Sequence, residues 1–478
     1  MVLRKNQMID LDITAASADG NGIGRYTDAE NLAGLVVFVP YTAVGDRIRC
    51  RITKMEKTYA FGRVEELLTP SADRVANTGC AVFGKCGGCA WRHVSYETEL
   101  SYKQAHVVDC MKRIGKLDTP VSAIVGAPAE DAYRNKAQFP VGAGESGPTV
   151  GFYAPRSHRI VPCRDCALQP PVFAEILRIV EAWMQAAGVS AYDEQMHRGL
   201  VRHIYIRRAE QTGEIMVCLV CTSGKIPEAQ RLVEELRKIE GMTSIQVNLN
   251  REKTNVILGK NSFVLWGKDA ITDILCGLKF RLSPLSFYQV NRTQAERLYG
   301  LAAEMAGLTG RETLLDLYCG TGTIGLSMAN RVQTLIGVEI VEAAIADAHR
   351  NAKENGIQNA RFLCGDAAEA AEKLESEGVQ PDVVVVDPPR KGCDEQLLRT
   401  VARMSPDRLV YISCNPATLA RDLARLKEYG YVPAEIVPVD MFPRTAHCET
   451  VALLSREKAD DYVRISVHTN DLKASQEQ

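Results

Sequence analysis

The chain has 478 residues, which is too long for one hydrophobic core and predicts two to four domains. Hydrophobic residues make up 46% and charged residues 24%, the composition of an ordinary globular protein. The formal net charge is -2, so the chain as a whole does not attract a polyanion, and nucleic-acid binding would have to come from local basic patches.

The sequence predicts a cytoplasmic protein with no membrane partner. Its N-terminus lacks the apolar segment of a signal peptide, and no apolar run approaches the length of a membrane span. In such a reducing compartment the 15 cysteines indicate core thiols, metal ligands or a nucleophile rather than a disulfide framework. No obligatory protein partner is inferred.

Residues 1–66 predict a small all-β module, because short alternating runs are separated by Gly and Pro. Positions 47–63 carry one acid, Glu56, against six basic residues: Arg47, Arg49, Arg51, Lys54, Lys57 and Arg63. Alternate spacing puts the first three on one strand face, and Tyr59 and Phe61 beside them offer rings that can stack on bases. A solvated strand face explains the same pattern, so both interpretations stay open.

Residues 70–265 predict a central α+β domain. It begins with a cysteine-rich segment and a helix over roughly 95–114. Strands are expected at 200–209 and 214–222, followed by an amphipathic helix at 227–239.

Residues 270–456 predict an α/β domain with a doubly wound sheet, because strands alternate with helical segments. The expected strands lie near 313–318, 334–339, 361–364, 382–386, 408–413 and 433–439. The remaining residues, 457–478, form a polar tail without apolar periodicity, and fraying is expected there.

The segment LLDLYCGTGTIG at 314–325 predicts a strand, a glycine-rich turn and a helix start that together bind a ligand. Three acids end successive strands: Asp316, then Glu339, which is placed to hold two ribose hydroxyls, then Asp366, which is placed near an adenine. This arrangement favours a methyl-donor pocket. Dinucleotide-binding folds use similar turns, so NAD remains an alternative.

The segment DPPRKG at 387–392 predicts a rigid loop over the donor, because proline fixes φ. Enzymes that methylate exocyclic amines use a similar loop closed by an aromatic residue. Here Arg390 stands in that place, and a cation suits an anionic backbone better than a stacked base.

Two later residues suggest that the methyl acceptor is a poor nucleophile. Cys414 follows an expected strand and precedes Asn415-Pro416, a setting that can tune a thiolate, and Glu449 begins another strand. Taken singly, Cys414 fits a buried core thiol and Glu449 fits a surface acid. Together with a donor pocket they indicate methylation at carbon 5 of a pyrimidine, an atom that needs covalent activation.

The motifs DLYCGTGTIG, DPPRKG, SCNPATLARD and FPRTAHCE, taken together, resemble those of the RNA uracil-5 methyltransferases. SPLSFYQVN at 283–291 is similar to the segment that precedes the donor domain in that family, and residues 1–66 resemble its TRAM domain, an OB-like RNA-binding barrel. The resemblance implies a multidomain α/β protein with a central α+β domain and a C-terminal Rossmann-like methyltransferase domain.

The resemblance also implies roles for individual residues. Cys414 matches the family's nucleophile and Glu449 its proton-accepting base. The residues that match its S-adenosyl-L-methionine site are Gln289, Tyr318, Glu339 and Asp387.

A cysteine set matches the family's iron–sulfur site. Its members are Cys80, Cys86, Cys89 and Cys166. Spacing alone does not separate zinc from iron–sulfur, and Cys163 competes for the fourth position. The resemblance favours a 4Fe-4S cluster, and it favours Cys166 because Leu-Gln-Pro follows it closely.

The implied activity is methylation of carbon 5 of uridine in RNA through a cysteine adduct at carbon 6. The resemblance favours 23S rRNA, because tRNA-specific members commonly lack the barrel and the cluster, and it leaves tRNA as the alternative. In either RNA an unstacked loop uridine is the expected target. Exocyclic-amine methylation would leave Cys414 without a role, and a non-catalytic RNA-binding protein would not need Glu449.

Overall fold

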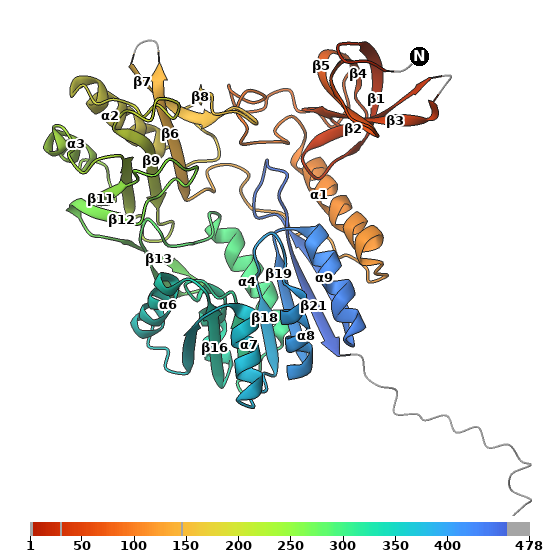
Figure 1. The fold of residues 1–478 in the computed structure, drawn as a ribbon, viewed down its shortest axis with the longest axis vertical. Helices are drawn as coiled ribbons and strands as arrows, with labels where there is room; N and C mark the ends of the chain where they lie inside the picture. Colours follow the sequence, from red (N-terminus) through yellow and green to blue (C-terminus); the bar gives the residue numbers. More distant parts are fainter. Residues whose placement is uncertain (1–2, 29–30, 145–146, 457–478) are drawn as a thin grey trace, which may run out of the picture.

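The computed structural model of the protein describes residues 3–28, 31–144 and 147–456 (Figure 1). A red barrel and a yellow-green sheet lie side by side, and a teal-to-blue α/β unit lies below both (Figure 1). The polar tail expected at 457–478 lies outside the described residues. Within the described ranges, no helix has the length and apolar character needed to span a membrane.

The N-terminal unit is a closed five-stranded barrel, as the alternating pattern predicts. Its strands are β1 (Met8–Ala16), β2 (Asn21–Asp28), β3 (Asn31–Pro40), β4 (Arg47–Met55) and β5 (Tyr59–Thr69), paired in the order β1-β2-β3-β5-β4. Over the first six residues of β1 and of β4, every second side chain is buried in the interior. The core is formed by Ile9, Leu11, Ile13, Val37, Val39, Ile48, Cys50, Ile52 and Ala60.

The basic strand face of the barrel is largely paired with acids of its own sheet. Arg49 contacts Asp10 at 2.9 Å and Glu66 at 3.0 Å, and Arg51 contacts Glu65 at 2.7 Å. These side chains are exposed or half-buried, so each pair contributes little to stability. The arginine face therefore presents less free positive charge than the sequence suggests.

The helix expected near 95–114 is α1 (Tyr96–Cys110), which continues into a π-helical turn at Met111–Gly115. Ser95 begins the helix, because its hydroxyl accepts a hydrogen bond from the backbone N–H three residues on. Val107 of α1 shares a buried cluster with Leu423 of the C-terminal unit. The helix therefore joins the barrel to the C-terminal unit rather than to the central sheet (Figure 1).

The central unit is a seven-stranded, mostly antiparallel sheet covered by two helices. Its strands are β6 (Lys136–Gly144), β7 (Gly147–Tyr153), β8 (Ile160–Pro162), β9 (Val201–Arg208), β10 (Ile215–Cys221), β11 (Met242–Leu249) and β12 (Asn261–Gly267), paired in the order β12-β11-β10-β9-β6-β7-β8. The helices are α2 (Val172–Ala186) and α3 (Ala229–Leu236). Phe139 and Ile204 of the sheet pack with Phe173 and Leu177 of α2 in one core.

The C-terminal unit is the expected α/β sheet, preceded by a hairpin and a helix. These are β13 (Ile271–Leu275), β14 (Leu278–Leu282) and α4 (Arg292–Ala306). The sheet strands are β15 (Thr313–Leu317), β16 (Thr334–Glu339), β17 (Ala360–Cys364), β18 (Val383–Val386), β19 (Arg408–Ser413), β20 (Tyr431–Val439) and β21 (Glu449–Arg456). The covering helices are α5 (Thr323–Met328), α6 (Glu342–Glu354), α7 (Ala367–Ser376), α8 (Glu395–Met404) and α9 (Pro416–Glu428), with a 3-10 turn at Ala329–Arg331.

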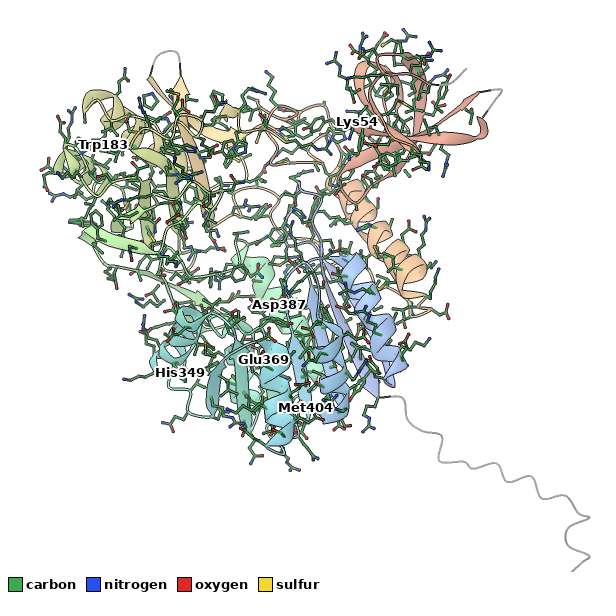
Figure 2. The ribbon with its side chains drawn as sticks, viewed as in Figure 1. Lys54, Trp183, His349, Glu369, Asp387 and Met404 are labelled. Carbon is green, nitrogen blue, oxygen red and sulfur yellow. The ribbon has the colours of Figure 1, made fainter. Side chains whose placement is uncertain are left out.

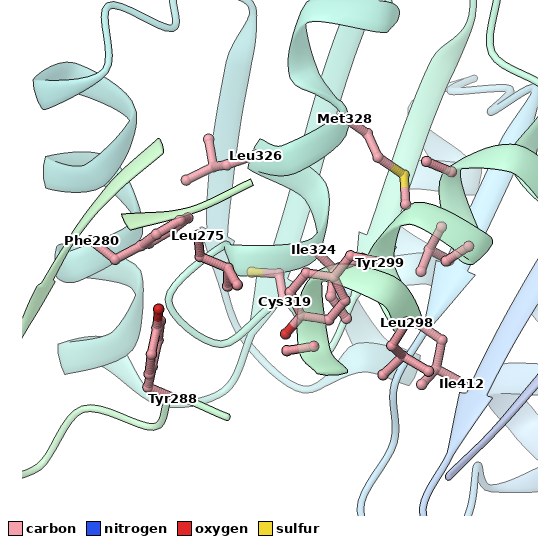
Figure 3. Close-up of a cluster of buried hydrophobic side chains, with 14 of the residues drawn as sticks. Leu275, Phe280, Tyr288, Leu298, Tyr299, Cys319, Ile324, Leu326, Met328 and Ile412 are labelled. Carbon is pink, nitrogen blue, oxygen red and sulfur yellow. The ribbon is translucent and has the colours of Figure 1, made fainter. Parts of the chain in front are cut away.

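The strand order of this sheet, β17-β16-β15-β18-β19-β21-β20, contains one reversal that matters for function. The chain runs outward from β15 through β16 to β17, then returns to the other side of β15 with β18. In such sheets the ligand crevice lies outside the carboxyl ends of the strands at this reversal. The side chains buried on one face of the sheet, among them Leu298, Tyr299, Ile324 and Ile412, hold α4 and α5 against it (Figure 3).

Candidate active site

The candidate site lies at the carboxyl ends of β15, β16, β18 and β19. The residues that follow β15, β18 and β19 are Tyr318, Asp387 and Cys414. Backbone hydrogen bonds tie the first two strand ends together, since the Asp387 N–H donates to the carbonyl of Leu317 at 3.4 Å. Figure 2 shows Asp387 on the side of the C-terminal unit that faces the other two units. Predicted site residues that are far apart in the sequence thus meet at one sheet edge.

The glycine-rich turn after β15 contains three left-handed backbone conformations. Tyr318 has a φ of 68°, Gly320 has a φ of 55°, and Gly322, which precedes α5, has a φ of 83°. Gly325 is needed for close packing, because a Cβ there would lie 2.7 Å from Oδ2 of Asp316. The absence of a Cβ at Gly325 therefore lets α5 pack directly against β15.

Glu339 ends β16 beside this turn. Its carboxylate accepts hydrogen bonds from the backbone N–H groups of Gly320 at 3.2 Å and Val341 at 2.9 Å. Ile340 and Val341, directly after it, are exposed by 65% and 53%. A fixed carboxylate next to exposed apolar side chains suits a ligand with hydroxyls and an aromatic ring.

The two other strand-end acids differ from each other in role. Asp366 caps α7, because its Oδ1 accepts from the N–H groups of Ala368 and Glu369. Asp316 is buried, its Oδ2 accepts from the Gly325 N–H at 2.8 Å, and its Oδ1 has no hydrogen-bond partner within the described residues. Burial raises the pKa of Asp316 to about 7. Capping of α7 therefore explains Asp366 without a contact to an adenine.

Gln289 lies in the segment between β14 and α4. Its carbonyl accepts a hydrogen bond from Nδ2 of Asn135 at 2.8 Å. The same segment is held by Arg207 of the central sheet, which donates to the carbonyls of Ser283 and Ser286. The hydroxyl of Ser286 in turn donates to Asp347 of α6 at 3.1 Å. Gln289 therefore stands where the central sheet meets the C-terminal unit.

Cys414 and Glu449 are brought together by strand pairing. β21 runs antiparallel to β19, and Ser413 pairs with Thr450, so the next pair of positions is Cys414 and Glu449. Glu449 is only 5% exposed, whereas Cys414 is half-buried. The nucleophile and base expected from sequence therefore occupy adjacent positions on neighbouring chain segments.

Burial and nearby carboxyls raise the pKa values of this pair. Burial raises the pKa of the Cys414 thiol to about 11, and the charge of Glu449 adds to that rise. Burial also raises the pKa of Glu449 to about 8, and Asp387 adds to it. Arg390 opposes both shifts, and burial raises the pKa of Asp387 to about 7. At neutral pH these shifts favour the protonated forms of Cys414 and Glu449.

The loop carrying Arg390 is fixed against the turn that carries Cys414. The carbonyl of Arg390 accepts from Nδ2 of Asn415 at 3.1 Å and from the hydroxyl of Thr418 at 3.3 Å. Asn415 also caps α9 through its Oδ1. Sequence reasoning treated Asn415 only as a neighbour of Cys414, although Asn before a Pro at a helix start is itself a capping signal.

Cys448, beside the proposed base, is a core thiol. It is 3% exposed, and its Sγ lies 3.2 Å from the carbonyl of Glu449 and 3.7 Å from that of Val439. Burial raises its pKa to about 12. A neutral thiol that packs between two strands explains this residue without a chemical role.

The predicted iron–sulfur ligands lie on two segments: three cysteines precede α1, and Cys166 lies between β8 and α2. Burial raises the pKa of the Cys86 and Cys89 thiols, and the charges of Cys166 and Cys80 add to both rises. The neighbouring Cys163 thiol lowers the pKa of Cys166. In the part of the chain that the structure describes, no three metal-ligating side chains are arranged to hold a metal ion. Four thiols are nevertheless the donor set that a 4Fe-4S cluster takes, so the chemistry of these residues fits such a group.

A cavity of about 570 Å³ opens where the barrel, the cysteine-rich segment and the C-terminal unit meet. Lys54 and Phe61 of the barrel line it, together with Cys89, Arg156 and His447. The Arg156 guanidinium lies 5.5 Å from the centre of the Phe61 ring. His447, two positions before Glu449 in the sequence, is the lining residue nearest in the chain to the candidate base.

Two family models match the sequence. One, described as tRNA (uracil-5-)-methyltransferase, matches residues 95–457, and the other, the TRAM domain, matches residues 3–64. The second match covers most of the five-stranded barrel.

Relatives and one solved structure agree with these matches. An uncharacterized RNA methyltransferase from Clostridium tetani is 43% identical over 95% of this chain and 97% of its own, and one from Halalkalibacterium halodurans is 44% identical over 95% and 98%. The crystal structure of Pyrococcus abyssi tRNA (uracil-54, C5)-methyltransferase, in complex with S-adenosyl-L-homocysteine, has a TM-score of 0.74 and 28% identity. The alignment covers 93% of this chain and 100% of the Pyrococcus abyssi chain. The protein therefore belongs to the family of RNA uracil-5 methyltransferases and carries an N-terminal TRAM domain.

Proposed function

We propose that this protein uses S-adenosyl-L-methionine to methylate carbon 5 of a uridine in RNA, with Cys414 as nucleophile and Glu449 as base. The pairing of β19 with β21 supports this most directly, because it sets a thiol and a carboxyl at adjacent positions beside Asp387. An exocyclic-amine methyltransferase needs no such thiol.

The donor site of this proposal consists of Gln289, Tyr318, Glu339 and Asp387. Glu339 would hold the ribose hydroxyls, since its carboxylate is already fixed by two backbone N–H groups. When bound, S-adenosyl-L-methionine supplies an electrophilic methyl group and a positive charge. The positive charge of a bound donor would lower the pKa values of Cys414 and Glu449, which burial raises.

The proposed reaction proceeds in four steps. The Cys414 thiolate forms a bond to carbon 6 of uracil, and the electrons of the 5,6 double bond move to give an enolate. Carbon 5 of this enolate would take the methyl group as the bond between that group and the donor's sulfonium sulfur breaks, which would leave S-adenosyl-L-homocysteine. The Glu449 carboxylate then removes the proton from carbon 5, the bond between sulfur and carbon 6 breaks, and the double bond re-forms.

The RNA is proposed to approach through the cavity beside His447. Phe61 and Arg156 line that cavity and offer an aromatic ring and a cation to an unstacked strand. We propose residues 1–66 and 70–265 as the parts that hold the RNA and residues 270–456 as the catalytic part. Because cellular RNA of this kind lies in the cytoplasm, we propose that compartment.

For the substrate we propose 23S rRNA, on the basis of the barrel together with the cysteine set. A second candidate is tRNA, because the solved tRNA (uracil-54, C5)-methyltransferase aligns over its entire length with 93% of this chain. That alignment takes in part of the barrel, which weakens the barrel as an argument against tRNA.

The 4Fe-4S cluster is proposed to be held by Cys80, Cys86, Cys89 and Cys166. The methyl transfer is redox-neutral, so the role proposed for the cluster is structural. Protein purified without oxygen is expected to contain iron and acid-labile sulfide, and replacing Cys86 with serine is expected to remove both. Zinc in place of iron would reject the cluster and keep a metal site.

The test of the function uses ribosomal and transfer RNA from cells that lack this gene. Each RNA is incubated with the protein and methyl-labelled S-adenosyl-L-methionine, in parallel with Cys414→Ala, and the labelled nucleoside is mapped. The proposal expects 5-methyluridine in rRNA and none with the variant. Label in tRNA alone would keep the chemistry and change the substrate, whereas a labelled amine unaffected by Cys414→Ala would contradict the mechanism.

A further inference from the structure

The loop that leads to Glu449 is held by segments from far away in the sequence. Residues 440–448 connect β20 to β21, and Val439 at one end of the loop pairs with Glu449 at the other. Asp440 directly follows Val439, and its N–H donates to the carbonyl of Val125 at 2.9 Å. A shift of this loop would therefore move the carboxyl of Glu449 relative to Cys414.

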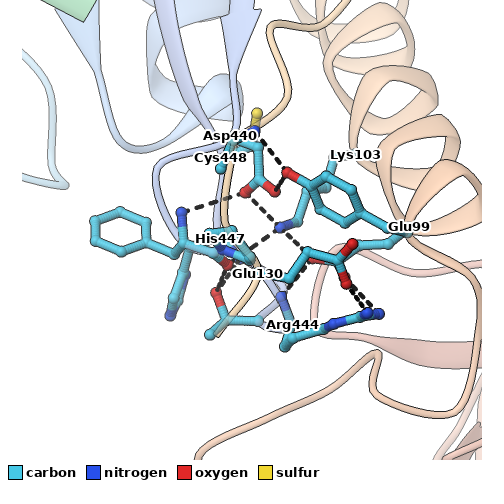
Figure 4. Close-up of polar contacts among 12 residues, drawn as sticks. Glu99, Lys103, Glu130, Asp440, Arg444, His447 and Cys448 are labelled. Carbon is cyan, nitrogen blue, oxygen red and sulfur yellow. Dashed lines mark hydrogen bonds and ion pairs between the residues drawn. The ribbon is translucent and has the colours of Figure 1, made fainter. Parts of the chain in front are cut away.

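A buried charge cluster lies against the first residues of this loop (Figure 4). The Nζ of Lys103 donates to Oε1 of Glu99 at 2.6 Å, to Oδ1 of Asp440 at 2.7 Å and to the carbonyl of Phe442 at 3.2 Å. The side chains of Lys103, Glu99 and Asp440 are only 0–2% exposed. The hydroxyl of Tyr96 donates to the other oxygen of Asp440 at 2.7 Å. One ammonium group of α1 thus holds the loop through both a side chain and a backbone carbonyl.

Arg444 extends this contact in the middle of the loop. It has a φ of 70°, and its N–H donates to Oε1 of Glu99 at 2.7 Å. Its carbonyl accepts from the N–H groups of Ala90 and Trp91, and its guanidinium pairs with Glu130. The unusual backbone conformation of this residue is therefore maintained by groups outside the loop.

Two further carbonyls of the loop are held in the same way. The carbonyl of Met441 accepts from Nδ2 of Asn291 at 3.1 Å, and that of Pro443 accepts from the Tyr133 hydroxyl at 2.9 Å. Four successive carbonyls, from Met441 to Arg444, therefore accept hydrogen bonds from other parts of the chain. Such a loop has one well-defined conformation.

We propose that Lys103, with Glu99 and Asp440, is a positioning residue that fixes Glu449 for removal of the carbon 5 proton. Three buried charged groups contribute little net stability compared with apolar side chains of the same size, so their value lies in specifying one arrangement. The inference rests on the proposed role of Glu449. Helix α1 contributes no group to the reacting atoms. Under this inference it nevertheless controls the last proton transfer, because Lys103 lies on it.

The test separates proton removal from the earlier steps. Lys103→Met is compared with Glu449→Gln and with Lys112→Met, a control at an exposed lysine in the turn after α1. Product and denaturation-resistant, methyl-labelled protein–RNA adduct are both measured. Lys103→Met is expected to lower product formation by about tenfold or more and to raise the adduct fraction, because carbon 5 is methylated before the base is needed. KM for RNA is expected to stay within about twofold of that of Lys112→Met, since Lys103 faces the loop rather than the cavity.

Asp440→Asn is a second variant, which removes the charge of the side chain and keeps its shape. The same measurements are made on this variant if Lys103→Met does not fold. Adduct and product that fall in parallel, or that do not change, would overturn the inference. If Glu449→Gln itself accumulates no methylated adduct, then the proposed role of Glu449 fails instead.

Discussion

The carboxyl of Glu449 is almost completely buried. Its protonation therefore affects the free energy of unfolding. Its pKa of about 8 in the folded protein lies above the usual value of 4.5, so folding favours the protonated form. The stability that comes from this preference for the protonated form is fully present below about pH 4.5. It is lost as the pH rises through about 8. Above that pH the folded protein holds a buried carboxylate that the unfolded chain would expose to water.

We therefore predict that Glu449→Gln stabilises the protein at pH 9 and changes little at pH 5. The gain at pH 9 is at most about 5 kcal/mol, the free energy that corresponds to a pKa of about 8 in place of 4.5. Denaturant unfolding of the two proteins across this pH range measures it. Glu435→Gln, at an exposed position of β20, is the matched control, and an equal gain for both variants at pH 9 would contradict the account.

Glu339 is the residue on which donor binding is expected to depend most. A hydrogen bond to a charged group contributes about 1.5–3 kcal/mol, so Glu339→Gln should weaken binding of S-adenosyl-L-homocysteine by roughly tenfold or more. Calorimetry of the free protein measures the affinity. The control is Glu354→Gln at the far, exposed end of α6, and equal affinities for the two variants would remove Glu339 from the site.

At the scale of elements, the glycine-rich turn depends on contact between α5 and β15. A Cβ on Gly325 would meet Oδ2 of Asp316 at 2.7 Å and Cδ1 of Leu335 at 2.8 Å. Gly325→Ala is therefore predicted to lower the free energy of unfolding by about 1–3 kcal/mol and to weaken donor binding. Gly300→Ala, in an open position of α4, should instead be neutral or add up to about 1 kcal/mol. Thermal unfolding with and without ligand compares them, and equal melting temperatures would contradict the packing argument.

The sequence predicts local elements well, because each strand of the C-terminal sheet carries its own apolar pattern. The strand expected at 408–413 is β19 at Arg408–Ser413, and the one expected at 433–439 lies within β20. The insertion of β21 between β19 and β20 is a long-range pairing, which no local pattern encodes. That pairing, rather than either residue's own context, brings Cys414 and Glu449 together.

The buried cluster at α1 shows a second limit of sequence reasoning. Glu99 and Lys103 have the four-residue spacing of an ordinary surface ion pair on a helix. Asp440, more than 300 positions later in the sequence, forms an ion pair with Lys103. The two residues of the helix are therefore part of a buried network. The motif FPRTAHCE is visible in the sequence, but its attachment to α1 is not.

At the scale of the whole molecule, the cavity between the three units is expected to guide the RNA. Base stacking on an aromatic ring contributes about 1–3 kcal/mol, so Phe61→Ala should raise KM for RNA by roughly tenfold and leave kcat nearly unchanged. Leu67→Ala, at an exposed apolar position of the same strand, is the control. Steady-state kinetics of the two variants measures both constants. A fall in the kcat of Phe61→Ala at constant KM would show that Phe61 does not contact the RNA.

The central claim is that Cys414 bonds to carbon 6 of the target uracil. It is tested most directly with substrate RNA that contains 5-fluorouridine, because Glu449 cannot remove fluorine from carbon 5 and the adduct persists. After incubation with S-adenosyl-L-methionine, the protein is denatured, digested and examined by mass spectrometry. We predict a methylated fluorouridine nucleotide attached to the peptide that contains Cys414, and none with Cys414→Ala. An adduct on another cysteine, or methylated RNA without any adduct, would contradict the account.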